Sequence, residues 1–325
     1  SKDIQGATQK ETPTFNTTAS NSAGDKIAIA PSAGYPAKLV DPATGRTIYE
    51  TSVTVAGEGT YTINPTTGEV TFTPEPDFVG TAKGVEVILS APVGRNKDGK
   101  VQEEYIKTAT AKYTPTVTPI TITPTDKVSE DIQNVPQTQT PTFELSNDKT
   151  AKITSKKLVD PATGQPTDEK TVTVSGEGTY TIDPSTGAVT FTPEKDFVGP
   201  TKGVKVQATA TITNAKGETS TITAEASYTP TVKSAAPTAK PATSKDIQGA
   251  TQTGTPTFAG TTVSVNGEDK EITIKDNSYT LLDKDGNEVT TTTAYAEDGT
   301  TPIGTFTINP ATGTVTFTPT DKSYT

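Results

Sequence analysis

The sequence predicts an all-β protein, in which tandem antiparallel β-sandwich modules are joined by short proline-rich linkers into an elongated chain. The first observation is internal repetition, because residues 57–87 recur at 176–206 with 24 of 31 positions identical and no gap. The second is that large apolar residues alternate with threonine at the period of two that strands show, with Pro, Gly and Asx turns between the runs. No segment shows a helical period long enough to predict a helix.

The repeat unit is as large as a domain. The block Asp-Ile-Gln begins at Asp3, Asp131 and Asp246, so successive copies start 128 and 115 residues apart. This period exceeds the roughly 20 to 50 residues of solenoid and propeller repeats, so each unit should have its own core. The predicted division is repeat 1 at 1–117, a linker at 118–128, repeat 2 at 129–232, a linker at 233–243 and repeat 3 at 244–325.

Prolines space both predicted linkers. Pro119 and Pro124 lie in the first linker, and Pro237 and Pro241 lie in the second linker. Such segments extend toward polyproline II at about 3.1 Å per residue. We therefore expect the linkers to hold the modules apart.

Each module contains a predicted hairpin with a recognisable turn. In the first copy the strands are residues 61–63 and 70–72. A proline presets φ at the first turn position, an Asx side chain accepts a hydrogen bond from the following backbone, and a glycine tolerates positive φ. Asn and Asp replace each other between copies, which suits a turn because either side chain can accept the bond. The predicted structural turn residues are Asn64, Pro65, Gly68, Asp183, Pro184, Gly187, Asn309, Pro310 and Gly313.

Aromatic residues face one another across these hairpins. They could serve as stacking platforms for sugars, but placement opposite each other at a period of two is typical of a core. We interpret them as core residues. The pairs are Tyr61 with Phe72, Tyr180 with Phe191, and Phe306 with Phe317.

Repeat 3 is predicted to be divergent and truncated. Its middle, residues 260–301, has no counterpart in the other copies, and it lacks matches to Phe197 and to the closing Tyr-Thr-Pro-Thr-Val of residues 228–232. Losing strands leaves unpaired edges and an uncovered sheet face. We expect this module to be the least stable of the three.

Composition excludes several classes of site. The chain has no Cys, His, Met or Trp, so it can form no disulfide, thiolate nucleophile or Cys/His zinc site. Its net charge of -10 is opposite to the basic surface that nucleic-acid binding requires. No apolar run approaches the length of a membrane span, and Ser1 begins neither a signal nor a transit peptide. We predict no catalytic residue, no cofactor, no small-molecule substrate, no nucleic-acid partner and no membrane insertion, and we interpret the chain as an internal part of a larger protein.

One short motif resembles a metal site. Asp283, Asp285 and Asn287 offer alternate oxygen ligands like the start of a calcium loop. The distal glutamate of such a loop is missing, and Asp-Gly is also a strong hairpin-turn signal. We favour the turn and keep the three residues as the candidate metal ligands.

Two glutamates lie between glycines in the hairpin blocks. Glu58 and Glu177 could promote an isopeptide bond or act as catalytic acids, but the third copy has Pro302 before Ile303 and Gly304 there. We interpret them as carboxylates at a strand edge.

Several spaced blocks agree in order and recur: Asp-Ile-Gln-Gly-Ala-Thr-Gln, Asp-Pro-Ala-Thr-Gly, Gly-Glu-Gly-Thr-Tyr-Thr-Ile, Val-Thr-Phe-Thr-Pro, Asp-Phe-Val-Gly and Tyr-Thr-Pro-Thr-Val. In these blocks the chain resembles the CshA-type fibril repeat of streptococcal cell-surface fibrillar adhesins. The resemblance implies an extracellular Gram-positive fibril, attached to the cell wall through a region absent from this fragment, which projects a separate adhesive tip. Repeat 2 departs from the pattern at Asn134, and repeat 3 departs in its middle.

Near-identical repeats, proline spacers and the lack of reactive side chains favour a non-catalytic structural stalk. The expected partners are the neighbouring repeats of the same chain and, laterally, other fibrils. The alternative is that the repeats themselves form a binding module for cell-cell or fibril-fibril adhesion. A large exposed apolar patch in the same place on repeats 1 and 2 would favour that alternative.

Overall fold

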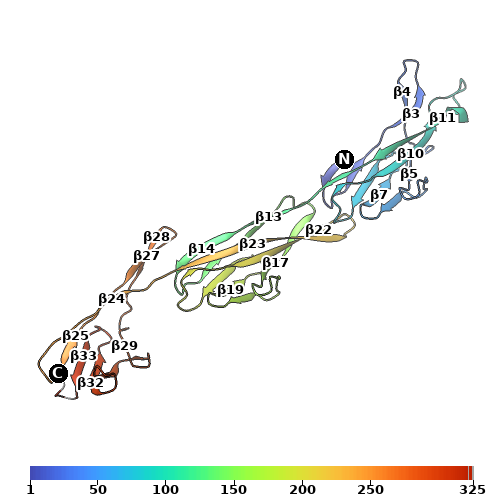
Figure 1. The fold of residues 1–325 in the computed structure, drawn as a ribbon. Coiled ribbons are helices and arrows are strands. Elements are labelled where there is room, and N and C mark those ends of the chain that lie inside the picture. The colour runs from blue at the N-terminus through green and yellow to red at the C-terminus, as the bar shows by residue number, and fades with distance from the viewer. Residues whose placement is uncertain (321, 324–325) are drawn as a thin grey trace.

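The computed structural model describes residues 1–320 and 322–323, and its regular secondary structure consists almost entirely of strands. Three bodies of strands, modules one, two and three, follow one another along an elongated molecule (Figure 1). One short 3₁₀ helix, η1 (Glu103–Tyr105), interrupts the first body. The predicted all-β class with tandem sandwich modules is confirmed.

Module one is a sandwich of antiparallel sheets. Its hairpin sheet has the order β2-β8-β7-β6, and its covering sheet has the order β11-β10-β5. A third small sheet, β1-β12-β9, closes one end, and the hairpin β3-β4 lies at the other (Figure 1). The strands are β1 (Lys2–Ile4), β2 (Gln9–Glu11), β3 (Phe15–Ser20), β4 (Lys26–Ile29), β5 (Lys38–Val40), β6 (Ser52–Val55), β7 (Gly59–Ile63), β8 (Val70–Pro74), β9 (Gly80–Thr81), β10 (Val85–Pro92), β11 (Ile106–Tyr113) and β12 (Thr116–Thr118).

Module two repeats this plan with longer strands. Its hairpin sheet is β15-β20-β19-β18, and its covering sheet is β14-β23-β22-β17, with β21 paired to β23. Strands β14 and β23 run parallel, as β1 and β12 do in module one. The strands are β13 (Ile122–Thr125), β14 (Lys127–Ile132), β15 (Gln137–Gln139), β16 (Thr142–Leu145), β17 (Ala151–Val159), β18 (Thr171–Val174), β19 (Gly178–Ile182), β20 (Val189–Pro193), β21 (Gly199–Pro200), β22 (Val204–Thr213) and β23 (Thr219–Lys233).

Module three contains the hairpin sheet, in the order β25-β33-β32-β31. Within the described residues it is joined only by three two-stranded sheets, β24-β26, β27-β28 and β29-β30, and no sheet matches β22-β23. The strands are β24 (Thr238–Lys240), β25 (Gln252–Gly254), β26 (Thr257–Ala259), β27 (Thr261–Val265), β28 (Glu268–Ile272), β29 (Leu281–Leu282), β30 (Glu288–Val289), β31 (Thr291–Tyr295), β32 (Pro302–Ile308) and β33 (Val315–Pro319).

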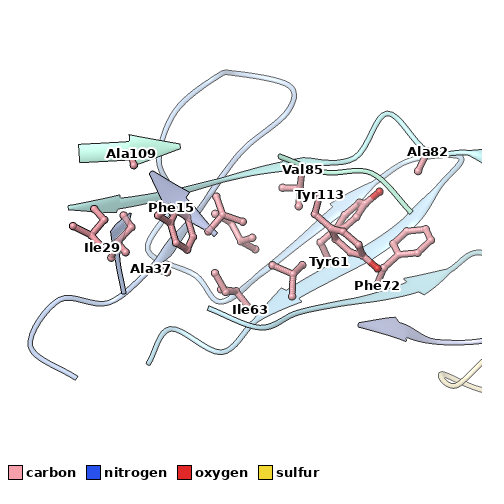
Figure 2. Packing of buried hydrophobic residues seen from close by; sticks show 14 of the residues in the cluster. Phe15, Ile29, Ala37, Tyr61, Ile63, Phe72, Ala82, Val85, Ala109 and Tyr113 are labelled. Atoms are coloured by element: carbon pink, nitrogen blue, oxygen red, sulfur yellow. The ribbon is translucent and has the colours of Figure 1, made fainter. Parts of the chain in front are cut away.

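The core of a complete module lies between its hairpin sheet and its covering sheet. In module one, Tyr61 and Phe72 are fully buried with ring centroids 4.6 Å apart, and Tyr113 from the covering sheet meets Tyr61 edge-on at 6.2 Å. Figure 2 shows these three rings grouped between the strands. Module two repeats the arrangement, with Tyr180 and Tyr228 at 6.3 Å. Strand β10 buries every second side chain, which is the pattern of a strand with one face on a core.

The predicted linkers differ from the structure. Residues 122–125 of the first form β13, which pairs with β16, and residues 238–240 of the second form β24, which pairs with β26. Each segment is therefore a strand of the module that follows it. Pro124 is accommodated because β13 belongs to a two-stranded sheet, where one edge needs no N–H donor. Ile120 is only 3% exposed, so the segment folds back onto the protein instead of extending as polyproline II.

The hairpin turn supplies the first test of the fold. Gly187 has φ of +82°, in the left-handed region that side chains strain to adopt. We expect Gly187→Val to destabilise module two by about 1 to 3 kcal/mol through backbone strain. Ala188→Thr should change little, because the equivalent residues are Glu69 and Thr314. Hydrogen exchange in residues 179–192 of the full chain measures the effect of each substitution on stability. Equal protection in the two variants contradicts the turn argument.

Candidate functional site: the joints between modules

The predicted turn residues are dispersed, with one turn in each module. Asn64 Oδ1 accepts from the Thr66 N–H at 3.1 Å, and Asp183 Oδ1 accepts from the Ser185 N–H at 2.9 Å and its hydroxyl at 2.6 Å. The Ser185 hydroxyl and N–H lower the pKa of Asp183 to about 2. In module three, Asn309 Oδ1 accepts from the Ala311 N–H at 2.9 Å. Each side chain holds its own turn, and the structure does not bring the three together.

The candidate calcium ligands also form a turn. Asp283 Oδ1 accepts from the N–H groups of Asp285 at 2.9 Å and Asn287 at 2.8 Å, between strands β29 and β30. The Asn287 amide donates to the other oxygen of Asp283 at 3.1 Å. In the described part of the chain, no three acidic side chains gather as metal ligands would. The geometry supports the turn that the sequence favours.

The two glycine-flanked glutamates are buried, so their assignment to a strand edge was wrong. Glu58 and Glu177 are each 6% exposed. Their carboxylates accept from the N–H of Lys83 at 2.8 Å and of Lys202 at 2.9 Å. Charge-assisted hydrogen bonds of this kind compensate for burying a carboxylate. Both glutamates therefore hold the loop that leads into the covering sheet.

The contacts between modules are the strongest candidate for a functional site. We call the contact between modules one and two joint 1, and the contact between modules two and three joint 2. Both joints involve the Asp-Ile-Gln block of the earlier module and the strands of the later one.

Joint 1 has an apolar centre. Ile4 of module one packs against a cluster formed by Ile120, Ala151 and Ile212, which are 3%, 1% and 0% exposed. This cluster is separate from the cores of the two modules. Burying a side chain of this size contributes about 1.5 to 3 kcal/mol. The hydrophobic effect therefore favours a closed joint.

Gly6 permits the close approach of the two modules in joint 1. Its φ is +77°, and a Cβ added to it would lie 3.2 Å from both Ile212 Cγ2 and the Thr213 carbonyl, and 3.3 Å from Thr150 Cβ. These distances are shorter than ordinary van der Waals contacts. A side chain here would both strain the backbone and push module two away.

Hydrogen bonds surround the apolar centre of joint 1. Three side chains of module two donate to backbone carbonyls of module one: Asn214 to Pro74 at 2.9 Å, Ser220 to Pro76 at 2.7 Å, and Thr150 to Gln5 at 2.6 Å. Asn214 is only 5% exposed, so its bond to the carbonyl satisfies a buried polar group. These directed bonds fix the orientation of the two modules as well as their contact.

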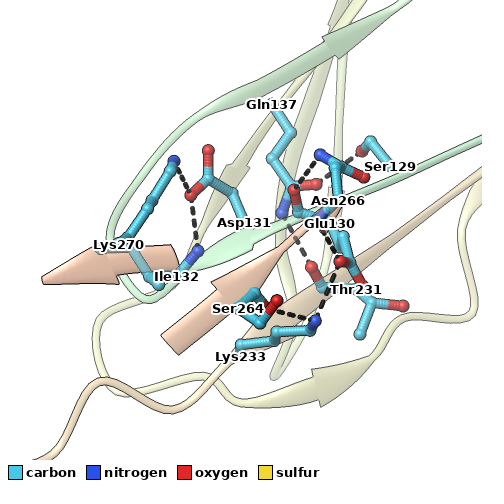
Figure 3. Close-up of polar contacts among 10 residues, drawn as sticks. All are labelled: Ser129, Glu130, Asp131, Ile132, Gln137, Thr231, Lys233, Ser264, Asn266 and Lys270. Carbon is cyan, nitrogen blue, oxygen red and sulfur yellow. Dashed lines mark hydrogen bonds and ion pairs between the residues drawn. The ribbon is translucent and has the colours of Figure 1, made fainter. Parts of the chain in front are cut away.

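Joint 2 is ionic. The hairpin β27-β28 of module three lies against β14 of module two, where Glu130 accepts from Lys233 Nζ at 2.9 Å and from the Asn266 N–H at 2.5 Å (Figure 3). Lys270 Nζ donates to Asp131 Oδ1 at 2.6 Å. The Lys233 ammonium and the Asn266 N–H hold the pKa of Glu130 below its ordinary value.

The two joints share one ion pair in spite of these differences. Asp3 of module one lies 3.6 Å from Lys149 Nζ of module two, as Asp131 of module two lies 2.6 Å from Lys270 of module three. Both lysines come from the segment that follows the Thr-Pro-Thr-Phe block. In each Asp-Ile-Gln block the aspartate also accepts from the isoleucine N–H, at 2.7 to 2.8 Å.

Sequence reasoning missed the joints. The recurring Asp-Ile-Gln block indicates the period and the family resemblance, and its recurrence was also the available signal of a joint. A second signal was Glu130, which stands where the other modules have Lys2 and Lys245. Its partners lie more than 100 residues away, so their identity could not be deduced without the fold.

Comparison with known proteins identifies one family. A family model described as the repetitive domain of surface adhesin CshA matches residues 1–117, 119–232 and 234–325. No curated protein matches the chain.

The similar solved structures are multidomain proteins. Mouse cadherin-23 EC22-24 is 13% identical with a TM-score of 0.22, covering 71% of this chain and 62% of its own. The I9-I11 tandem of titin is 12% identical with a TM-score of 0.25, covering 72% and 63%. The human desmocollin-1 ectodomain is 13% identical with a TM-score of 0.25, covering 98% and 52%. The chain thus spans less than two thirds of each of these structures.

Joint 1 can be tested at Gly6. We expect Gly6→Val to broaden the distribution of distances between modules one and two, because the added side chain meets Ile212 and Thr150. Gly249→Val is the matched control, since Gly249 has φ of +81° and its nearest neighbour is Lys322 at 3.4 Å, within its own module. Fluorescence energy transfer between two introduced cysteines measures the distance, as the chain has none of its own. An unchanged distribution in Gly6→Val contradicts the role of this contact.

Joint 2 should respond to pH. Lys233 belongs to module two, so the part of the lowered pKa of Glu130 that depends on closure comes from the Asn266 N–H. This bond favours the closed joint while Glu130 is ionised, and its contribution is lost as the pH falls through the lowered pKa. We expect the distance between modules two and three to broaden between pH 5 and pH 3, each taken as an approximate limit. The charged groups around it are Asp131, Lys233 and Lys270. Glu130→Gln should reduce the pH response, and an identical response in this variant would exclude Glu130 as its cause.

Proposed function

The chain belongs to the family of CshA surface adhesin repetitive domains, and from this premise we propose that its modules form a non-catalytic stalk that projects an adhesive region from the cell surface. Membership in the family supports an extracellular surface protein. Attachment to the cell wall, through a part of the protein outside these residues, belongs to the proposal. No helix in the described part of the chain is long and apolar enough to span a membrane.

The observation that carries this proposal is the pair of closed joints. A stalk must transmit its direction from one module to the next, and a flexible linker cannot do so. Here the modules lie in succession along one direction (Figure 1), and each consecutive pair is held by side chains of both partners. The aspartate of the Asp-Ile-Gln block pairs with a lysine of the next module at both joints, so this part of the contact recurs with the repeat.

The glycine-flanked glutamates and the Asx turn side chains of the modules have structural roles. The carboxylates of Glu58 and Glu177 are occupied by backbone N–H groups, and the Asx side chains are occupied by their own turns. A catalytic group needs a free lone pair or proton beside a site for a substrate. These occupied groups support a role without catalysis.

The surfaces of modules one and two do not favour adhesion through the repeats. The exposed large apolar residues that occupy the same place in both modules are Val79 and Val198, each 45% exposed. Single exposed valines are ordinary on a protein surface, whereas binding surfaces present contiguous patches of several hundred Å². Tyr49, 86% exposed, has no aromatic counterpart in module two. The stalk therefore remains the function that the geometry supports best.

Small-angle scattering tests the stalk. We expect the maximum dimension of the chain in solution to approach the sum of three module lengths and to stay constant as the protein concentration rises. The Gly6→Val variant serves as a comparison, since a loosened joint 1 should broaden the distance distribution. A compact envelope contradicts the stalk, and concentration-dependent growth of the particle supports homotypic adhesion instead.

A further inference from the structure

The hairpin sheet of module three matches those of the other modules in order and register. In module two, Gln137 pairs with Phe191, which pairs with Tyr180 on the next strand. In module three, Gln252 pairs with Phe317, which pairs with Phe306. The same backbone positions therefore carry the same kinds of side chain.

The face above these rings differs between the modules. Tyr180 is 0% exposed because β22 and β23 cover it, whereas Phe306 is 37% exposed. Within residues 1–320 and 322–323, no sheet covers the rings of module three. A cavity of about 180 Å³ opens there, lined in part by Ser244, Gln252, Phe306 and Phe317. Most small-molecule pockets are larger, roughly 300 to 1,000 Å³.

A hydrogen-bonded set of a serine, a glutamine and a tyrosine, which we call the clasp, shows which side chain the cavity fits. In module two, Ser129 Oγ donates to Gln137 Oε1 at 2.5 Å and lies 2.8 Å from the hydroxyl of Tyr228. Module one has the same clasp, in which Ser1 Oγ donates to Gln9 Oε1 at 2.7 Å and lies 2.6 Å from the hydroxyl of Tyr113. Module three keeps the first half, with Ser244 Oγ donating to Gln252 at 2.9 Å. No described tyrosine of module three completes it.

An unpaired backbone segment lies beside this cavity. In module two, β14 forms a parallel ladder with β23, so that Glu130 faces Thr231 and Asp131 faces Val232. The corresponding residues 245–247 belong to no strand, and Ile247 is 78% exposed. An unpaired backbone segment of this kind accepts a further strand through main-chain hydrogen bonds.

We propose that this face of module three is a docking surface for the closing strand pair of a CshA-type repeat, with the chemistry of β22 and β23. The apolar side of the strand pair covers Phe306 and Phe317, its tyrosine enters the cavity and bonds to Ser244, and the following Thr-Pro-Thr-Val pairs with residues 245–247. The cavity, the half-clasp and the unpaired segment each match one part of this occupant. A second copy of module three, packed face to face on this one, would cover the aromatic rings but would supply neither the tyrosine nor the paired strand.

The probe is a synthetic peptide of residues 204–233, added to the full chain. We expect saturable binding of one peptide per chain, and a rise in hydrogen-exchange protection of residues 305–318, which should be less protected than 179–192 beforehand. Replacing Tyr228 by Phe in the peptide should weaken binding about 3- to 10-fold, the effect of one hydrogen bond.

Matched variants of the chain locate the contact. Ser244→Ala should weaken binding of the parent peptide by a similar factor and should add nothing to the Tyr228→Phe change, because both remove one bond. Ser129→Ala should leave binding unchanged, since the face of module two is already covered. Equal effects of the two serine variants overturn the assignment.

A covalent form keeps the test decisive if the free peptide aggregates. The same segment, joined to the chain by a flexible Gly-Ser linker, is presented at an effective concentration in the millimolar range. Protection of residues 305–318 should then rise in the fusion and fall again on Ser244→Ala. Unchanged protection in the fusion overturns the proposal, and so does dimerisation that buries the same residues without any added segment.

Discussion

The stacking of a closing tyrosine on the hairpin aromatics is the contact on which each module depends. Tyr113 and Tyr228 come from the covering sheet, and each meets an inward aromatic of the hairpin sheet at close to a right angle. Edge-on pairs of this kind add about 0.5 to 1.5 kcal/mol to the burial of their area. Each hydroxyl also reaches the serine of the clasp. One residue thus connects the first strand and both sheets, so the last strand is required to complete the core.

Much of this architecture could be predicted from local patterns. The three modules, the all-β class and the burial of Tyr61 and Tyr180 followed from repetition and from a period of two. Those signals suffice because a hairpin is determined by its own turn and by residues close in sequence. The linkers were predicted wrongly as polyproline II segments, because proline suits both polyproline II and an edge strand. The choice between these two conformations depends on the strands that contain Phe143 and Phe258, which pair with the linker residues.

Two other features could not be predicted from the sequence, for a different reason. They are the burial of Glu58 and Glu177 and the presence of the two joints. A glutamate between glycines looks exposed until a loop about 25 residues away supplies N–H donors to it. To predict a joint, one must know which ends of two modules meet, and the sequence pattern of a single module does not contain that information. The recurring Asp-Ile-Gln block and the substitution of Glu130 for lysine pointed there, but the meaning of Glu130 depends on Lys233 and Asn266.

The two joints show where a tandem repeat can vary without losing its fold. The hairpin block is nearly invariant between modules one and two, because each of its inward residues packs against a partner in the same module. The segment after the Thr-Pro-Thr-Phe block faces the neighbouring module, so it is free to change in length and charge. In module two this segment contributes Ala151 to an apolar contact, and in module three it forms a hairpin carrying Lys270. Hydrophobic burial persists at high salt, whereas exposed ion pairs are screened. A chain of similar modules can therefore have unequal stiffness along its length, and this segment contributes to the difference at each joint.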